Sequence, residues 1–513
     1  MENSKYKLKV LLANLPWQRN GRWGVRAGSR WPHILDRSEG EYLSFPFFLA
    51  YATSLLLKNN IDAVMVDAIA EQIPEDQFIE RILSMNVDYL VTETSVPSFG
   101  DDLKMLEKIS KAGIRIILCG PNSEIYKPEF LEANQYIDLV IFGEYEFTLL
   151  ELIQCLQKGQ ALNEVKGLIH RDDGKIIKNP AREPFDINFL PWPYRDGLPM
   201  NKYLDAPGNM PLPCVQMAAS RGCPFRCSFC LWPQVIYQGH HYRVREVIDV
   251  VNEMEYLVRE KGFKSIYFDD DTFNIGKERM LQFCNEVIKR GLQGVPWAIM
   301  ARADLMDNEI LSAMKTAGIW AVKYGVESVD ELMIEDCRKA LNLEKNTRMI
   351  KLTKALGIRV HLTFTFGLTG ETKESIRDTV GYALRLDPDS VQFSVLTPFP
   401  GTELFEELEK ENRIITKDWS KYDGHYYCVF KPENLAPQEL VEEKFKAYRI
   451  WGEYQRNKRG FRGDLDRFRR YLDRNGIKFA INKTINYFKY VWFKKERYLK
   501  SKTLTSNEER NNH

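Results

Sequence analysis

Residues 215–233, VQMAASRGCPFRCSFCLWP, join a strand-like run to a loop that holds Cys223, Cys227 and Cys230. Three thiols are one too few for a closed structural zinc site, which takes four ligands. The other six cysteines are scattered singly, so the sequence offers no second cluster to complete such a site. Three thiolates suit a 4Fe–4S cluster in which one iron keeps an open coordination position. A zinc site completed by a distant cysteine or histidine remains the alternative.

Strand and helix patterns alternate downstream of this loop, over residues 213–415. Strands are expected near residues 215–220, 264–273, 296–304, 321–328, 361–372 and 390–402, and helices near 245–262, 278–291, 308–318, 344–357 and 373–386. Six such units predict an open, partial (β/α)6 barrel of the TIM type. Its active site is expected on the loops that follow the strands, where the three cysteines lie.

A second alternation precedes the cysteine loop and occupies residues 1–158. Strands are expected near residues 9–16, 62–68, 88–95, 115–122 and 138–144, and helices near 45–59, 75–86, 101–113 and 147–159. The pattern predicts a doubly wound, Rossmann-like α/β domain whose ligands bind at the carboxyl ends of the strands. Residues 159–212 contain a hairpin with an Asp-Asp-Gly turn and then a linker rich in proline and glycine.

Composition indicates a globular chain with no strong overall field. The 513 residues are 44% hydrophobic and 28% charged, with a formal net charge of +1. Neither nucleic acid nor a membrane is therefore favoured as a partner by charge. The amino terminus lacks the apolar run and cleavage site of a signal peptide, and no window is apolar enough to span a membrane. Isolated cysteines are typical of reduced thiols, so we expect a cytoplasmic protein.

The motif CPFRCSFC, together with the barrel, resembles the Cys-x3-Cys-x2-Cys signature of radical S-adenosylmethionine enzymes, including the aromatic Phe229 before the last cysteine. The resemblance implies that the open iron chelates the amino and carboxylate groups of S-adenosylmethionine. Electron transfer to this cofactor then releases a 5′-deoxyadenosyl radical, which abstracts hydrogen from a substrate. A one-electron donor such as flavodoxin or ferredoxin is implied as partner.

The same resemblance implies further contacts to S-adenosylmethionine from the later barrel loops. It places an acidic turn near the amino group, a cation near the carboxylate, a carboxylate near the ribose and a glycine strand end near the adenine. Each residue alone has an ordinary alternative, since acids cap helices, surface arginines form ion pairs and glycines form turns. The implied contacts are Phe229, Asp270, Asp271, Arg302, Glu327, Ser328 and Gly367.

An amino-terminal doubly wound domain ahead of this barrel resembles the cobalamin-dependent subclass, over residues 1 to about 415. The implied cobalamin contacts are Pro16, Trp17, Ser95, Gly120, Pro121, Asn122, Gly143 and Glu144. The loop after the first strand lacks the Asp-x-His of mutase-type domains. We therefore expect the nucleotide tail to be buried and no histidine to ligate cobalt, His33 being the one candidate in that loop. A domain that binds another nucleotide, or none, is the alternative.

Residues 416–513 are expected to be mostly helical and, towards the end, basic. Between Arg449 and Lys500 the chain carries sixteen Lys and Arg against five Asp and Glu. One amphipathic face would gather Ile477, Ile481, Ile485, Phe488 and Trp492. Packing against the barrel is the favoured interpretation of this helix, and peripheral contact with an anionic membrane is the alternative. No nucleic-acid-binding module accompanies the charge.

The predicted function is that of a cobalamin-dependent radical S-adenosylmethionine enzyme. Methylation of an unreactive carbon or phosphorus centre, with cobalamin carrying the methyl group, is the favoured chemistry. The alternatives are a non-methylating cyclase, oxidase or ring-rearranging enzyme that uses cobalamin as a redox partner, and a sensor without turnover. The substrate is predicted to be a small molecule or a lipid, and no residue identifies it.

Overall fold

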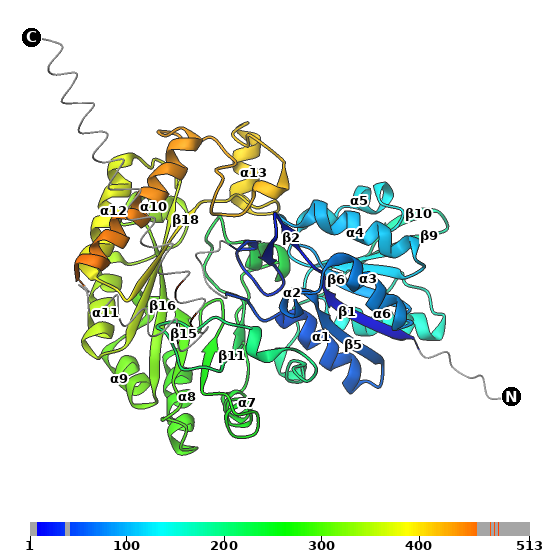
Figure 1. Ribbon diagram of the computed structural model, residues 1–513, viewed down its shortest axis with the longest axis horizontal. Helices are drawn as coiled ribbons and strands as arrows, with labels where there is room; N and C mark the ends of the chain where they lie inside the picture. Colours follow the sequence, from blue (N-terminus) through cyan, green and yellow to red (C-terminus); the bar gives the residue numbers. More distant parts are fainter. Residues whose placement is uncertain (1–7, 36–41, 459–471, 473–476, 478–480, 482–513) are drawn as a thin grey trace, which may run out of the picture. The chain divides into compact units, whose positions relative to one another are not determined.

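The structure, a computed structural model, describes residues 8–35, 42–458, 472, 477 and 481 (Figure 1). Residues 1–445 form one compact unit and residues 446–513 a second. A helix runs over residues 437–458. The basic amphipathic helix expected around residues 477–492 lies outside the described residues, apart from Ile477 and Ile481. Within the described part of the chain, no helix combines the length and apolarity needed to cross a membrane.

The amino-terminal domain is built on a seven-stranded sheet in the order β10-β9-β8-β7-β6-β1-β5. Five neighbouring strands of this sheet, β8, β7, β6, β1 and β5, are parallel. Helix α1 packs against α6 and β5, and the remaining helices connect the other strands. The elements are β1 Lys9–Asn14, α1 Phe47–Lys58, β5 Asp62–Asp67, α2 Ala68–Glu71, α3 Glu75–Ser84, β6 Tyr89–Glu93, α4 Phe99–Lys111, β7 Arg115–Cys119, α5 Pro128–Ala133, β8 Leu139–Ile141 and α6 Glu146–Lys158.

Strand β1 is the topological switch point of this sheet. It pairs with β5 on one side and with β6 on the other, so the chain runs to one neighbour first and then crosses to the second. The loops after β1 and β6 therefore run to opposite faces of the sheet and leave a crevice between them. Doubly wound folds bind their ligands in this crevice. The predicted hairpin forms as β9 Leu168–Asp172 and β10 Lys175–Lys178, and β9 extends the sheet antiparallel to β8.

The second sheet is a six-stranded parallel half-barrel in the order β11-β14-β15-β16-β17-β18. Strand order in space follows strand order in the sequence, as the alternating pattern predicted. The elements are β11 Cys214–Met217, α7 Val247–Arg259, β14 Ser265–Phe268, α8 Lys277–Lys289, β15 Trp297–Ala301, α9 Asn308–Thr316, β16 Ile319–Glu327, α10 Glu331–Asp336, α11 Leu343–Ala355, β17 Arg359–Phe366, α12 Lys373–Leu386, β18 Ser390–Val395 and α13 Glu403–Lys410. The predicted α/β fold class, a Rossmann-like domain followed by a partial barrel, is confirmed.

Alternation along β17 decides which side chains enter the barrel. Phe364 is fully buried and packs edge-on against Tyr382 of α12. Its neighbours Thr363 and Thr365 point the other way, because successive side chains of a strand face opposite sides. His361 lies on that same inner side. The helix-facing side of the strand is thus apolar, and the lumen side is polar.

Several short elements were not predicted. A three-stranded sheet, β2 Gln18–Arg19, β3 Arg22–Val25 and β4 His33–Ile34, forms within the loop after β1. Strands β12 Ser220–Arg221 and β13 Arg243–Val244 pair beside the cysteine loop. Elements of two to four residues carry no periodicity that a sequence pattern can reveal.

Candidate active site

The three cysteines lie on one curled loop at the carboxyl edge of the half-barrel. All three thiols are free and half-buried. The side-chain amide of Gln234 curls the loop by donating to the carbonyl oxygens of Cys227, Ser228 and Cys230, at 3.3, 3.2 and 2.9 Å. The three predicted ligands thus lie on one loop, whose backbone Gln234 ties together. Gln234 was not predicted, although it follows Cys230 by only four residues.

Burial dominates the chemistry of these thiols. It raises the pKa of Cys223 and of Cys227, and it raises that of Cys230 well above its ordinary value, with Cys227 as the next cause. Raised pKa values favour the protonated thiols, so a cation that binds here must displace their protons. A cationic iron–sulfur cluster supplies that charge. Within residues 8–35 and 42–458 no three Cys, His, Asp or Glu side chains are grouped to hold a metal ion.

The backbone that enters the loop requires glycine. Gly222 has a φ of +84°, and a Cβ there would lie 1.8 Å from the carbonyl oxygen of His241. Its N–H donates to Asp271 Oδ2 at 3.0 Å. The acidic turn after β14 therefore holds the residue that precedes Cys223.

Asp270, a predicted S-adenosylmethionine contact, is buried and already bonded. Its carboxylate accepts from the Ala219 N–H at 3.2 Å and from the Ser220 hydroxyl. Burial raises its pKa to about 6. Its visible role is to tie the end of β14 to the segment that leads into the cysteine loop.

Asp271 and Asp269 are paired with a residue of the amino-terminal domain. Arg30 donates from Nε to Asp271 Oδ1 at 3.0 Å and from Nη1 to Asp269 Oδ1 at 2.8 Å. Its guanidinium lies 4.5 Å from the ring centroid of Trp232, just after the cysteines. Tyr237 donates a further hydrogen bond to Asp271 at 3.0 Å. No local pattern marks Arg30, because its partners lie about 240 residues away.

Arg302 was predicted to bind a carboxylate of the cofactor, and in the structure it pairs with Asp304. Two nitrogens reach the Asp304 carboxylate at 3.1 and 2.7 Å. The guanidinium carbon lies 3.7 Å from the ring centroid of Phe225, between the first two cysteines. This stacking fixes the loop from the barrel side.

Glu327 ends β16 in a backbone conformation that side chains rarely adopt, with a φ of +68°. Its two oxygens accept from Lys339 Nζ and Thr365 Oγ1, both at 2.7 Å. Ser328 beside it is buried and accepts from the Asp330 N–H at 3.1 Å. Backbone strain of this kind clusters at functional sites.

Gly367 ends β17 with a φ of +105° and donates its N–H to the Glu371 carboxylate. Burial raises the pKa of Glu371 to about 8, so the side chain is protonated at neutral pH. Phe229, the aromatic residue of the motif, is half-buried. The predicted cofactor contacts thus lie at the ends of five strands, β11, β14, β15, β16 and β17, or in the loops that follow them.

The barrel lumen beneath this edge is lined by polar groups. Lys323 on β16 pairs with Asp205 of the linker at 2.7 Å, and His361 Nδ1 lies 2.8 Å from Ser390 Oγ. Burial, followed by the charge of Lys323, lowers the pKa of His361 to about 3. The imidazole is therefore neutral, and the lumen suits a ligand that forms hydrogen bonds.

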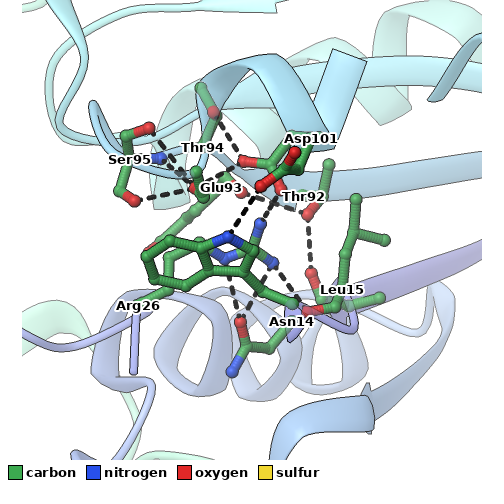
Figure 2. Close-up of polar contacts among 12 residues, drawn as sticks. Asn14, Leu15, Arg26, Thr92, Glu93, Thr94, Ser95 and Asp101 are labelled. Carbon is green, nitrogen blue, oxygen red and sulfur yellow. Dashed lines mark hydrogen bonds and ion pairs between the residues drawn. The ribbon is translucent and has the colours of Figure 1, made fainter. Parts of the chain in front are cut away.

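A buried polar network fills the switch point of the amino-terminal sheet. Arg26 donates to Asn14 Oδ1 at 3.1 Å and to the Leu15 carbonyl at 3.1 Å (Figure 2). It also forms an ion pair with Asp102. Thr94 donates to the same Asp102 carboxylate at 2.8 Å. The loops after β1 and β6 are thereby joined through one guanidinium.

Some of the residues predicted to contact cobalamin surround this network. Trp17 follows Pro16 and donates from Nε1 to Asp101 Oδ2 at 3.0 Å, and Ser95 Oγ lies 2.8 Å from Ser98 Oγ. Both Trp17 and Ser95 are buried. These side chains lie at the switch point, as doubly wound ligand sites require.

The loop after β7 packs tightly against the loop after β6. A Cβ at Gly120 would lie 2.8 Å from the Thr94 carbonyl oxygen, and Pro121 next to it is buried. Asn122 accepts from the Glu124 N–H at 3.2 Å, while its buried Nδ2 has no partner among the described residues. That orphaned amide is the observation here that suits a bound ligand.

Gly143 and Glu144 face the barrel instead. Glu144 forms ion pairs with Arg221 at 3.0 Å and with Arg243 at 2.7 Å, on the β12–β13 pair. A Cβ at Gly143 would lie 3.3 Å from the Gln238 side chain. Glu144 therefore holds the domains together through the strand that leads into the cysteine loop.

A cavity of about 990 Å³ opens at the switch point. The loop after β1, the start of α4 and residues 417–427 line it. Five lysines and arginines face three aspartates around it, together with tryptophan and tyrosine rings. His33 lines the cavity, and its ring centroid is 4.6 Å from that of His425. Lining residues include Trp17, Arg19, His33, Gly100, Trp419 and Tyr426.

Comparison with known proteins identifies the family. The model of the radical SAM superfamily matches residues 217–383, from the end of β11 into α12. An uncharacterized methyltransferase, PH0819, of Pyrococcus horikoshii is 31% identical over 407 residues, which cover 79% of this chain and 86% of the relative. The chain belongs to the radical SAM superfamily. The matched range includes the loop that holds Cys223, Cys227 and Cys230.

Further relatives of this radical SAM protein differ in reaction. The anaerobic magnesium-protoporphyrin IX monomethyl ester cyclase of Rubrivivax gelatinosus is 29% identical over 425 residues, covering 79% of this chain and 73% of the relative. Cytidylyl-2-hydroxyethylphosphonate methyltransferase of Streptomyces wedmorensis is 26% identical over 429 residues, covering 72% and 79%. The family thus includes methyltransferases and a cyclase.

Solved structures share the whole two-domain fold. The radical S-adenosylmethionine methyltransferase TsrM of Kitasatospora setae has a TM-score of 0.65 at 18% identity, covering 79% of this chain and 76% of that one. The cobalamin-dependent radical enzyme OxsB has a TM-score of 0.64 at 16% identity, covering 94% and 71%. The predicted membership of the cobalamin-dependent radical SAM enzymes is confirmed. So is the cofactor set of that family: a 4Fe–4S cluster, S-adenosylmethionine and cobalamin.

Proposed function

We propose that this radical SAM protein is a cobalamin-dependent methyltransferase acting on an unactivated carbon or phosphorus centre. One observation carries the proposal: the loop after β1 serves both halves of the molecule. It lines the switch-point cavity with Trp17 and His33, and with Arg30 it fastens the acidic turn beside the cysteines. Two cofactors bound at these places would share one interface, as transfer between them requires.

The cysteine loop suits a 4Fe–4S cluster, since it offers three free thiols and its backbone is held by Gln234 and by the stacking of Arg302 on Phe225. Bound there, the cluster supplies the electron that cleaves S-adenosylmethionine. Glu327 is the group we assign to the ribose hydroxyls, because Lys339 and Thr365 fix its carboxylate at the strand end. The polar barrel lumen would hold the substrate beneath this edge.

We place cobalamin in the switch-point cavity. Its volume, its excess of cationic side chains and its aromatic walls suit a bulky ligand that carries a phosphodiester. Cobalamin supplies the methyl group when bound. Under this assignment, His33 and its neighbours in the cavity wall would contact the ligand. The expectation that no histidine ligates cobalt is retained as part of this proposal.

Gly100 gives a direct test of the cavity. A Cβ at this position of α4 would meet no atom within 4 Å, so a large side chain can project into the cavity without displacing the backbone. We expect Gly100→Trp to abolish cobalamin retention during gel filtration and to leave iron content unchanged. Gly294→Trp is the matched control, because a Cβ at Gly294 is equally unobstructed and this residue does not line the cavity. Full cobalamin retention by Gly100→Trp would refute the assignment.

The methyltransferase assignment is tested by isotope transfer. The anaerobically reconstituted protein is incubated with a small-molecule extract, a reductant and S-adenosylmethionine labelled with a trideuterated methyl group. We expect a product that carries the intact label, together with S-adenosylhomocysteine and 5′-deoxyadenosine. Deoxyadenosine accompanied by an unlabelled product would contradict methylation. It would favour the cyclase type of reaction, for which the Rubrivivax relative is the supporting observation.

The partners follow from the same chemistry. A radical SAM enzyme needs a one-electron reductant, and we propose a flavodoxin or ferredoxin. The proposed substrate is a small molecule or lipid with hydrogen-bonding groups, in keeping with the polar lumen. A cytoplasmic location and the absence of nucleic-acid binding stay predictions. For residues 477–492, packing against the barrel stays the favoured interpretation and membrane contact the alternative. Liposome co-sedimentation of the full chain and of a chain ending near residue 475 checks the last of these.

A further inference from the structure

The protein's own chain fills the crevice between the loops after β1 and β6. Residues 24–28, which we call the plug, run from the end of β3 into the loop that follows it. A Cβ at Gly24 would lie 2.0 Å from a ring carbon of Trp17. At the other end of the plug, a Cβ at Gly28 would lie 2.0 Å from the Phe45 carbonyl oxygen. Both ends of the plug are therefore packed so closely that not even a methyl group fits.

Arg26, in the middle of the plug, reaches into the crevice. Its guanidinium donates to Asn14 at the end of β1 and to Leu15 after it (Figure 2). From the other side it pairs with Asp102 of α4, whose second oxygen accepts from Thr94 after β6. The side chains of Arg26 and Asp102 are only 1% and 2% exposed. The crevice is thus filled with polar groups that already bind one another.

The cavity of about 990 Å³ does not extend into the crevice. Trp17 and the start of α4 line the cavity. Arg26, Ser95 and Asn122 are not among its lining residues. Part of a ligand can enter the crevice only by displacing Arg26, which would leave Asp102 buried without its cation. Breaking a buried pair in this way would weaken binding about a hundredfold or more, so the structure favours ligands that stay in the cavity.

Two cationic side chains of the cavity wall are available to such a ligand. Arg22 and Lys104 are exposed and line the cavity. Among the described residues neither forms an ion pair, in contrast to Arg19, which pairs with Asp101. A phosphodiester in the cavity can therefore pair with Arg22 and Lys104. Solvent screens charges at exposed positions, so each pair would contribute only modestly to binding.

We propose that the protein binds corrinoids without recognising their lower base, because Arg26 and the rest of the plug occupy the crevice that would otherwise receive that base. The inference rests on the proposed cobalamin site. The phosphodiester would face Arg22 and Lys104, and the base would remain in the open cavity. The ligand class is thus any corrinoid that carries a phosphodiester, of which cobalamin is one. This departs from the expectation, drawn from the sequence, that the nucleotide tail is buried.

The test is equilibrium dialysis of the full chain against three corrinoids: cobalamin, the corrinoid in which adenine replaces dimethylbenzimidazole, and cobinamide. We expect the first two to have dissociation constants within about fivefold of each other, since neither base enters the crevice. A stronger preference for cobalamin would overturn the inference, because it would require a site shaped for the benzimidazole. Cobinamide lacks both the phosphodiester and the base, and it should bind about fivefold more weakly than cobalamin at low salt.

Variants check the position of the phosphodiester. Arg22→Gln combined with Lys104→Gln should lower the affinity for cobalamin to that for cobinamide and leave cobinamide binding unchanged. Arg81→Gln is the control, because it replaces an exposed arginine of the same domain that does not line the cavity. An equal loss of affinity for both corrinoids would also overturn the inference. Failure of the wild type to bind any of the three corrinoids would instead refute the proposed cobalamin site itself.

Discussion

Replacing Arg30 by glutamine tests how the two domains are joined beside the cysteines. The guanidinium is 17% exposed, and the carboxylates of Asp269 and Asp271 are 9% and 7% exposed. Removing one partner from a buried ion pair costs about 3–5 kcal/mol, because the remaining charge is left uncompensated. Asp271 keeps its bonds from Gly222 and Tyr237, so we take the lower end, about 3 kcal/mol.

This free energy converts into a measurable fall in the unfolding midpoint. The entropy of unfolding averages about 2.1 cal/mol/K per residue, so a cooperative unit of residues 1–445 loses about 3 °C for about 3 kcal/mol. The assay is thermal unfolding followed by near-ultraviolet circular dichroism under anaerobic conditions. Arg81→Gln is the control, because its pair with Glu71 is exposed and worth less than about 1 kcal/mol.

The pH dependence has a definite sign. Burial raises the pKa of Asp269 in the folded chain even with Arg30 present, and removing the guanidinium raises it further. A carboxyl with a raised folded pKa binds more protons folded than unfolded, so stability grows as pH falls. The deficit of Arg30→Gln should therefore be larger at pH 8 than at pH 5.5. Adding Asp269→Asn and Asp271→Asn should recover most of it. Equal midpoints for Arg30→Gln and Arg81→Gln would refute the reasoning.

Three further predictions concern single groups. Gln234→Leu removes the three hydrogen bonds that curl the cysteine loop, so iron per chain should fall by about half or more while the far-ultraviolet circular dichroism stays unchanged. Full iron content would show that these hydrogen bonds are not needed to form the cluster site. Glu371→Gln should raise the unfolding midpoint at pH 8 and not at pH 5. The pKa of Glu371 is about 8 in the folded chain and about 4.3 in the unfolded chain, so the wild type loses stability as the pH rises from about 4.3 to 8, and glutamine does not ionise. A difference independent of pH would contradict this. Tyr145→Phe removes the hydroxyl that donates to Glu93, whose pKa burial raises to about 7. The free energy of unfolding should fall by about 1–2 kcal/mol at pH 8, where Glu93 is ionised, and by less at pH 6. An unchanged unfolding midpoint at pH 8 would argue against this hydrogen bond.

The fold and the cluster motif were accessible from the sequence because both depend on local signals. Within residues 8–415, the helices of nine residues or more and the strands of both large sheets lie where the hydrophobic pattern places them, whereas the shorter helices α5, α10 and α13 were not predicted. Cys223, Cys227 and Cys230 lie within eight consecutive positions. Parallel strands bring their following loops to one edge, so the acidic turn and Glu327 could also be placed there.

Partners distant in the chain could not be predicted. The sequence showed that Asp270, Asp271 and Arg302 lie on the right loops, but not that each is already bonded to protein groups. Arg30 belongs to the irregular loop after β1 and has no spacing that marks it. Such contacts are decided by which loops pack together, a property of the assembled sheets.

The central claim, that the cysteine loop cleaves S-adenosylmethionine reductively, is tested most directly by measuring 5′-deoxyadenosine. Wild type, Cys227→Ala and Cys284→Ala are reconstituted anaerobically with iron, sulfide and cobalamin and given S-adenosylmethionine and a strong reductant. We expect deoxyadenosine from the wild type and from Cys284→Ala, whose thiol is buried on α8 away from the cysteine loop. We expect none from Cys227→Ala, with cobalamin still bound. Deoxyadenosine from Cys227→Ala at the wild-type rate, or none from the wild type, would contradict the claim.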